Sequence, residues 1–202
     1  MSKKDIVMES TFKLLLKKGL TDVSNNDIIE ESKVGSGTIY HHFEDKDDLI
    51  VSTFNKYIHM MLWGRLDIVK NFKGDTYSTL EVLFRQIIGC DDAQRPYYVL
   101  EDSEDYSYKQ AILLICEAIQ KYDSLRIQYN EFNDAFIDFI AELIERGKRN
   151  SEIRDDISTE EACNIIQVVF NGILFMYMIQ EDFDLDYAIE FNMNNFREYT
   201  KK

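Results

Sequence analysis

The sequence predicts an all-α fold, with an N-terminal three-helix helix-turn-helix domain followed by a larger helical domain, about nine to ten helices in all. The chain of 202 residues contains one proline and eight glycines, the two residue types that helix interiors tolerate least. Apolar residues recur every three or four positions along most of the chain, which is the period of an amphipathic helix. Serine or aspartate precedes several of these stretches, as a helix cap does.

The first fifty residues contain three of the expected helices. The first covers about residues 4–18 and ends before Gly19, because glycine commonly follows the last residue of a helix. The second begins after Ser24, and Asp27 three residues later indicates a capping box. The third covers residues 36–42 and follows a short turn. Two short helices joined by such a turn form a helix-turn-helix.

The later helices follow from the same signals. Asp45, with Asp48 three residues on, indicates the start of a fourth helix whose apolar pattern continues to Leu62. Residues 90–108 are irregular and acidic and contain the single proline. The remaining helices are expected at about residues 77–89, 108–122, 125–149, 158–180 and 186–199. These elements predict two domains, residues 1–48 and residues 49–202.

The charge of the chain limits how it can bind nucleic acid. Its formal net charge is −14, and residues 1–50 contain seven lysines, ten acidic residues and no arginine. Binding of such a domain to DNA has to rely on few phosphate contacts and is expected to depend weakly on salt. We expect no membrane-spanning stretch and a cytoplasmic location, since no run of about 18 apolar residues stands out.

Residues 33–49, KVGSGTIYHHFEDKDDL, carry the most specific pattern in the chain. Together with the two preceding helices, this stretch resembles the DNA-binding domain of the tetracycline-repressor (TetR) family of transcriptional regulators. The sequence departs from the family pattern at Lys33, where a turn glycine is usual, and at Gly35, where a serine is usual. The matching positions are Gly19, Ser24, Ile28, Val34, Gly37, Thr38, Ile39, Tyr40, His42, Phe43, Lys46, Asp47 and Leu49.

The resemblance implies a homodimeric regulator, most often a repressor, that releases a palindromic double-stranded DNA operator when a small molecule binds the C-terminal domain. Hydroxyl and imidazole groups near the third helix offer hydrogen bonds to phosphates and base edges. We expect Tyr40 and His41 to be exposed, and Ile39 and Phe43 to be core. The expected DNA-binding residues are Ser24, Asn25, Gly35, Ser36, Gly37, Thr38, Tyr40, His41 and Lys46.

Two further sites are expected in the larger domain. Aromatic residues predict a pocket for a hydrophobic or aromatic ligand, although an aromatic stripe at helical spacing is also typical of plain core. The candidate pocket residues are Trp63, Phe84, Tyr97, Tyr98, Tyr106 and Phe170. The resemblance implies that the helices at 125–149 and 158–180 form the dimer interface, and the alternative is again simple core. The candidate interface residues are Phe136, Ile140, Val168, Gly172, Phe175 and Met176.

No pattern in the sequence indicates catalysis, a metal or a cofactor. The three histidines include the adjacent pair His41 and His42, whose side chains point about 100° apart on a helix and cannot jointly grip an ion. The three cysteines have no metal-ligand spacing and are expected to be buried free thiols. The chain is therefore not expected to be an enzyme. An all-helical protein-interaction module without sequence-specific DNA binding is the alternative reading.

Overall fold

The computed structural model describes residues 2–88 and 108–202. These residues divide into two compact units. The first unit contains residues 2–61 and 108–130, and the second contains the remaining described residues. Helices joined by short turns make up both units, so the predicted all-α fold is confirmed.

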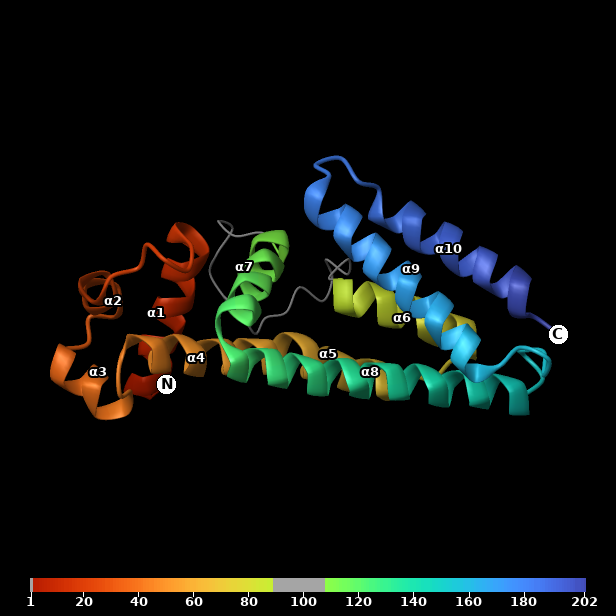
Figure 1. Ribbon diagram of the computed structural model, residues 1–202, viewed down its shortest axis with the longest axis horizontal. Coiled ribbons are helices and arrows are strands. Elements are labelled where there is room, and N and C mark those ends of the chain that lie inside the picture. Colours follow the sequence, from red (N-terminus) through yellow and green to blue (C-terminus); the bar gives the residue numbers. More distant parts are fainter. Residues whose placement is uncertain (1, 89–107) are drawn as a thin grey trace. The chain divides into compact units, whose positions relative to one another are not determined.

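The first unit begins with four helices, and α1 to α3 gather around the start of α4 (Figure 1). They are α1 (Lys3–Lys18), α2 (Asn25–Ser32), α3 (Ser36–His42) and α4 (Lys46–Ile58). Ser24 caps α2 in a full capping box with Asp27. Asp45 caps α4 by accepting a hydrogen bond from the Asp48 amide at 2.8 Å. Both caps were predicted, and they set where α2 and α4 begin.

Aromatic side chains fill the core of the first unit. The ring of Phe12 stacks on Tyr57 with centroids 4.1 Å apart and meets the edge of Phe54 at 6.2 Å. Ile39 and Phe43 are buried in the same unit. Phe43 follows the last residue of α3, so α3 is anchored through these two side chains while most of its other residues face outward.

The first unit also contains α7 (Tyr108–Lys121) and the start of α8 (Asp123–Arg149). Tyr122, between these helices, donates its hydroxyl hydrogen bond to Asp47 Oδ1 at 2.7 Å. This bond fastens the α7–α8 junction to the first turn of α4. By their contacts, residues 108–130 therefore group with the helix-turn-helix. The predicted boundary between a DNA-binding domain at residues 1–48 and a second domain at residues 49–202 stays a prediction.

The second unit packs its helices around a core of aromatic and aliphatic side chains. It contains α5 (Gly64–Lys70), α6 (Thr76–Ile88), the rest of α8, α9 (Thr159–Ile179) and α10 (Leu185–Thr200). Phe170 meets Phe84 edge-on at 5.2 Å and lies 4.9 Å from Phe136. The π-helical segment His59–Trp63 separates α4 from α5, where the sequence predicted one uninterrupted helix.

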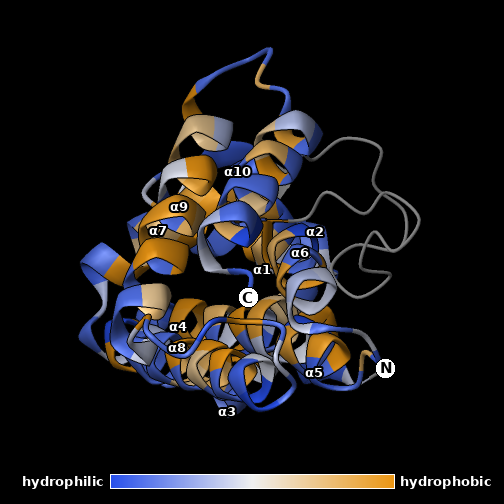
Figure 2. Cartoon of the chain, turned by 90° about the vertical axis from the view of Figure 1, so that its right-hand side faces the viewer, coloured by the Kyte–Doolittle hydropathy of each residue, from blue (hydrophilic) through white to orange (hydrophobic). Residues whose placement is uncertain are grey.

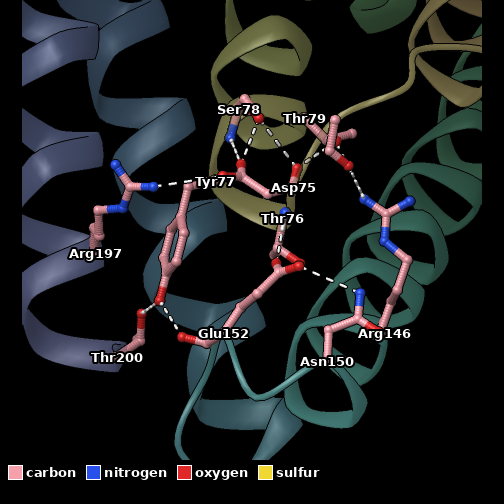
Figure 3. A network of polar contacts seen from close by, with 11 residues as sticks. Asp75, Thr76, Tyr77, Ser78, Thr79, Arg146, Asn150, Glu152, Arg197 and Thr200 are labelled. Atoms are coloured by element: carbon pink, nitrogen blue, oxygen red, sulfur yellow. Dashed lines mark hydrogen bonds and ion pairs between the residues drawn. The ribbon is translucent and has the colours of Figure 1, made fainter. Parts of the chain in front are cut away.

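A network of polar contacts closes one end of the second unit (Figure 3). Tyr77 donates to the Glu152 carbonyl at 3.1 Å and shares a 3.0 Å hydrogen bond with Thr200 Oγ1. The Glu152 carboxylate accepts a hydrogen bond from the Thr76 amide at 2.8 Å. The Arg197 guanidinium lies 4.8 Å from the centre of the Tyr77 ring. These contacts join the start of α6 to the turn after α8 and to the end of α10.

Gly147 lies against this network, and replacing it with alanine is expected to destabilise the protein. The added Cβ would lie 2.7 Å from Thr76 Oγ1 and 2.9 Å from Ile153 Cδ1. Overpacking costs roughly 1–3 kcal/mol and alanine returns about 1 kcal/mol of helix propensity, so a net loss of up to about 2 kcal/mol is expected. Urea unfolding at fixed protein concentration measures it. Gly64→Ala is the matched control, since nothing lies within 4 Å of its added Cβ. Equal effects of the two changes would contradict the prediction.

The ends of the predicted helices agree with the structure to within two residues, the π-helical interruption apart. The irregular segment expected at residues 90–108 falls almost wholly outside the described residues. Cys163 is buried as expected, Cys116 is exposed on α7, and Cys90 lies outside the described residues. The expectation for Cys116 was wrong because its position on α7 faces away from the core side chains Ala111, Leu114 and Ile115.

Candidate nucleic-acid interface

The outward side of α3 is polar and open to solvent. Tyr40 is 52 % exposed, and His41 and His42 are exposed beside it. Ile39 and Phe43 are buried, in agreement with the prediction for these side chains. Such a helix places hydrogen-bonding groups where a DNA groove or backbone is able to meet them.

The entrance to α3 is built from small residues. Lys33 ends α2 in the left-handed conformation, with φ of 55°. Gly35 then precedes α3 and, having no side chain, makes no side-chain cap hydrogen bond. A Cβ added to Gly35 or Gly37 would meet nothing within 4 Å. Ser36 is exposed and Thr38 is half-buried. The space beside both glycines is open, so a duplex backbone is able to approach closely.

Four of the predicted DNA-binding residues line one notch of about 10 Å³ between α2, α3 and the start of α4. They are Asn25, Ser36, Tyr40 and Lys46. The amide Nδ2 of Asn25 donates a hydrogen bond to Tyr40 Oη at 2.9 Å. The sequence analysis predicted all four as DNA-binding residues but did not foresee this bond, because nothing in the sequence links two polar residues 15 positions apart.

The hydroxyl of Ser24 already forms the hydrogen bonds of the α2 helix cap. Its hydroxyl accepts from the Asp27 amide at 3.2 Å and donates to the Asp27 carboxylate at 2.7 Å. The bonds from Lys18 and Ser24 lower the pKa of Asp27 below its usual range. A phosphate contact from the Ser24 hydroxyl would therefore have to replace an existing hydrogen bond, which makes Ser24 a weaker candidate than the residues around the notch.

Lys46 places a cation at the notch. Its side chain is half-buried in the first turn of α4, and no ion pair is formed by it within the described part of the chain. The neighbouring carboxylates are engaged elsewhere: Asp45 caps the Asp48 amide, Asp48 accepts from the Glu44 amide at 2.9 Å, and Asp47 accepts from Tyr122. A cation at a helix start opposes the helix dipole, so an anion outside the protein suits it.

The candidate ligand-pocket residues are only partly brought together. Tyr97, Tyr98 and Tyr106 lie outside the described residues. Phe84 and Phe170 are buried in the core of the second unit. Trp63 is half-buried and meets Phe132 edge-on at 5.6 Å. The burial of Phe84 and Phe170 favours the core role that the sequence left open, and the pocket role of Trp63 stays a prediction.

The candidate dimer residues divide into two groups. Phe136 and Ile140 are 3 % and 0 % exposed inside the second unit, so the protomer's own core covers them and they leave the proposed interface. Val168 and Phe175 on α9 are 65 % and 56 % exposed, and a Cβ added to Gly172 would meet nothing within 4 Å. Met176 is half-buried beside them.

We define the α9 outer stripe as Val168, Gly172, Phe175 and Ile179, all exposed at helical spacing. Figure 2 shows α9 in the colour of apolar residues along most of its length. On α10, the exposed rings of Tyr187 and Phe191 stack at 5.8 Å. The sequence analysis missed this pair, because acidic neighbours interrupt the apolar pattern of α10.

α9 is also long and apolar enough to cross a membrane by length and composition, a property that the sequence analysis did not expect. Its other face carries Ile166, Phe170 and Ile173 into the core of the second unit. Helices at the core of globular domains commonly have this composition. Only 22 % of its apolar stretch is buried within the chain, and the α9 outer stripe lies in the exposed part.

No group of three or more histidine, cysteine, aspartate or glutamate side chains is arranged to hold a metal ion among the residues that the structure describes.

Comparison with known sequences gives a consistent result. Residues 7–53 match the sequence profile of the bacterial regulatory proteins of the tetR family. An HTH-type transcriptional regulator of Staphylococcus aureus (strain bovine RF122 / ET3-1) is 25 % identical over 178 residues, covering 86 % of this chain and 80 % of that protein. An HTH-type transcriptional regulator of Lactococcus lactis is 32 % identical over 62 residues. The match spans only 31 % of the Lactococcus protein.

Solved structures share the fold over the whole chain. A TetR-family transcriptional regulator of Cytophaga hutchinsonii aligns with a TM-score of 0.70 at 20 % identity, covering 100 % of this chain and 98 % of that one. A Saccharomonospora viridis protein in complex with choline aligns with a TM-score of 0.74 at 17 % identity, covering 98 % of each chain. At these identities the likeness establishes the fold.

Proposed function

The chain belongs to the TetR family of bacterial regulatory proteins, and from this premise we propose that it is a ligand-responsive transcriptional regulator. As a homodimer it binds a palindromic operator in double-stranded DNA, and it acts as a repressor that releases the operator when a small molecule binds. The observation that carries the proposal is the exposed side of α3, where Tyr40 and His41 stand next to the notch that Lys46 lines.

The chemistry of this face suits DNA despite the negative charge of the chain. Ser36, Tyr40 and Lys46 are hydrogen-bond donors around one notch, and DNA phosphates accept such bonds. His41 and Thr38 lie on the same helix, and their polar groups are of the kind that reaches base edges. Because few positive charges are involved, specific contacts have to supply most of the affinity, and nonspecific binding is expected to be weak.

The proposed dimer forms through the α9 outer stripe. A palindromic operator presents two half-sites about one helical turn apart, and reading both takes two copies of α3. A second copy of the chain is the occupant that fits the stripe, because an apolar face of this kind on an acidic chain is matched by its own symmetric copy. Gly172 in its middle allows two helices to approach closely.

The proposed ligand is small and hydrophobic or aromatic and binds in the second unit, with Trp63 as the candidate contact there. The Saccharomonospora protein of the same fold holds choline, a quaternary ammonium of the type that aromatic side chains bind well. The ligand has to change the ratio of the DNA-binding state to the released state from 99:1 to 1:99. For this it needs to bind the released state more tightly by about 5.5 kcal/mol.

Lys46→Ala tests the proposal directly. Removing one phosphate contact is expected to weaken binding to all duplexes alike and to lower the salt slope, log Kd against log salt, by about one unit. The measurement is a fluorescence-anisotropy titration of a selected duplex and a scrambled one over a range of salt concentrations. Lys70→Ala, an exposed lysine on α5 in the second unit, is the matched control and is expected to change neither quantity. A loss confined to one duplex would mean that Lys46 reads bases.

The protein-interaction module remains the alternative, and it differs in one measurable property. A module of that kind would enrich no duplex from a random-sequence DNA library, whereas the proposed regulator enriches a palindrome. We propose no catalytic activity, no cofactor and no membrane association for the chain, and a cytoplasmic location, where its DNA target lies.

A further inference from the structure

We propose that Asn25 is a positioning residue, whose side-chain amide holds Tyr40 in place and directs the Tyr40 hydroxyl proton toward a DNA phosphate. This inference rests on the proposed DNA binding. It starts from the 2.9 Å hydrogen bond that Asn25 Nδ2 donates to Tyr40 Oη. The bond joins the first residue of α2 to the outward side of α3.

The direction of this bond decides what Tyr40 is able to do. A tyrosine hydroxyl has one proton to donate and an oxygen that accepts. Phosphate oxygens accept hydrogen bonds, so a tyrosine hydroxyl that contacts a phosphate has to donate. Because the amide of Asn25 donates to Tyr40, the phenol proton points away from Asn25 and is left for another acceptor. Accepting one bond also polarises the hydroxyl and makes it a better donor.

The surroundings favour an acceptor from outside the chain. Ser36 and Lys46, both donors, line the same notch as Asn25 and Tyr40. Asp45 also lines the notch, and one of its two carboxylate oxygens, Oδ1, accepts a hydrogen bond from the Asp48 amide. The phenol proton of Tyr40 therefore joins a group of donors gathered at one place, which suits a single phosphate.

The bond contributes little to holding α2 and α3 together. Ile28 of α2 and Ile39 of α3 are buried in the core of the first unit, and they fix how the helices pack. Asn25 and Tyr40 are both exposed, so water replaces their bond at small cost when it is broken. What the bond does fix is one orientation of an otherwise free side chain, which lowers the ordering cost of binding.

Exchanging the amide for a carboxylate reverses the bond, and this gives the test. In Asn25→Asp the new carboxylate accepts a hydrogen bond from the Tyr40 hydroxyl, which is then no longer able to donate to the phosphate. Asn26→Asp is the matched control, since Asn26 is the exposed next residue of α2 and adds the same charge without reaching Tyr40. Both changes are made in the full chain and again in a Tyr40→Phe background. The probe is a duplex that the wild-type chain selects from a random-sequence library.

Asn25→Asp is expected to weaken binding of this duplex roughly tenfold more than Asn26→Asp, the effect of losing a hydrogen bond to a charged group. In the Tyr40→Phe background this excess is expected to disappear, because no phenol proton is left to capture. Asn25→Ala, which adds no competing acceptor, is expected to lose less than Asn25→Asp. The thermal unfolding midpoint is expected to stay the same in all of these variants.

Three results would overturn the inference, and they are distinguishable. An equal excess in both backgrounds would mean that Asn25 acts through charge alone. A lower thermal midpoint for Asn25→Ala, matching its loss of affinity, would assign Asn25 a purely structural role. Unchanged affinity in Tyr40→Phe would remove Tyr40 from the contact while DNA binding itself stands. A wild-type chain that selects no duplex would instead refute the proposed function.

Discussion

Replacing Phe175 with glutamate is expected to turn the protein into a monomer at micromolar concentration and to abolish tight operator binding. Phe175 is more than half exposed in the protomer, so the substitution costs the protomer little. In the dimer it would place a charge in the middle of an apolar contact, where an unpaired ion costs several kcal/mol. Loss of the dimer then separates the two copies of α3, and each half-site is bound alone.

Sedimentation velocity measures the change, with Ile68→Glu as the control. Ile68 is another exposed apolar residue, on α5 of the second unit, and its replacement is expected to leave the dimer intact. Gly172→Leu gives a second test, since a Cβ added there meets nothing within 4 Å in the protomer, and loss of the dimer would then point to contact with the partner. A Phe175→Glu variant that still sediments as a dimer would place the interface elsewhere.

Phe84→Ala is expected to lower the free energy of unfolding by about 3–5 kcal/mol, as deletion of a buried phenylalanine does. Phe84 is fully buried, and its ring meets Phe170 edge-on. A pocket residue would behave differently, because a side chain lining a ligand cavity has fewer packing partners to lose. The size of the loss therefore separates the core role from the pocket role.

Urea unfolding followed by circular dichroism, at one fixed protein concentration, gives this free energy. The fixed concentration matters because dimer formation adds to apparent stability. Ile68→Ala, which shortens an exposed side chain, is expected to change it by less than about 0.5 kcal/mol. A loss below about 1 kcal/mol for Phe84→Ala would contradict the core assignment and would return Phe84 to the list of pocket candidates.

The parts of the fold that the sequence predicted well depend on local signals. Ser24 with Asp27, and Asp45 with Asp48, mark helix starts through contacts three residues apart, which a sequence shows directly. The π-helical segment at residues 59–63 has no such signal, because its apolar residues fit an α-helical pattern equally well. Its wider turn is a property of the backbone and not of residue type.

The sequence predicted which side chains are buried better than it predicted which part of the structure covers them. The apolar positions of α8 indicated correctly that Phe136 and Ile140 are covered, but a stripe on a helix does not tell the protomer's own core from a second copy. The same limit applies to the bond from Asn25 to Tyr40 and to the bond from Tyr122 to Asp47. Each joins residues that are distant in sequence, and only the packing of the first unit brings them together.

Lys33 destabilises the backbone of the turn before α3, and a glycine at this position would avoid that destabilisation. A side chain in the left-handed conformation is disfavoured by roughly 1–2 kcal/mol, and Lys33 adopts it with φ of 55°. Yet this turn leads directly into α3, in a segment where acidic residues outnumber lysines and arginine is absent. The chain keeps a positive charge there at the expense of local backbone stability. At this turn the residue type therefore trades backbone stability for one positive charge directly before α3.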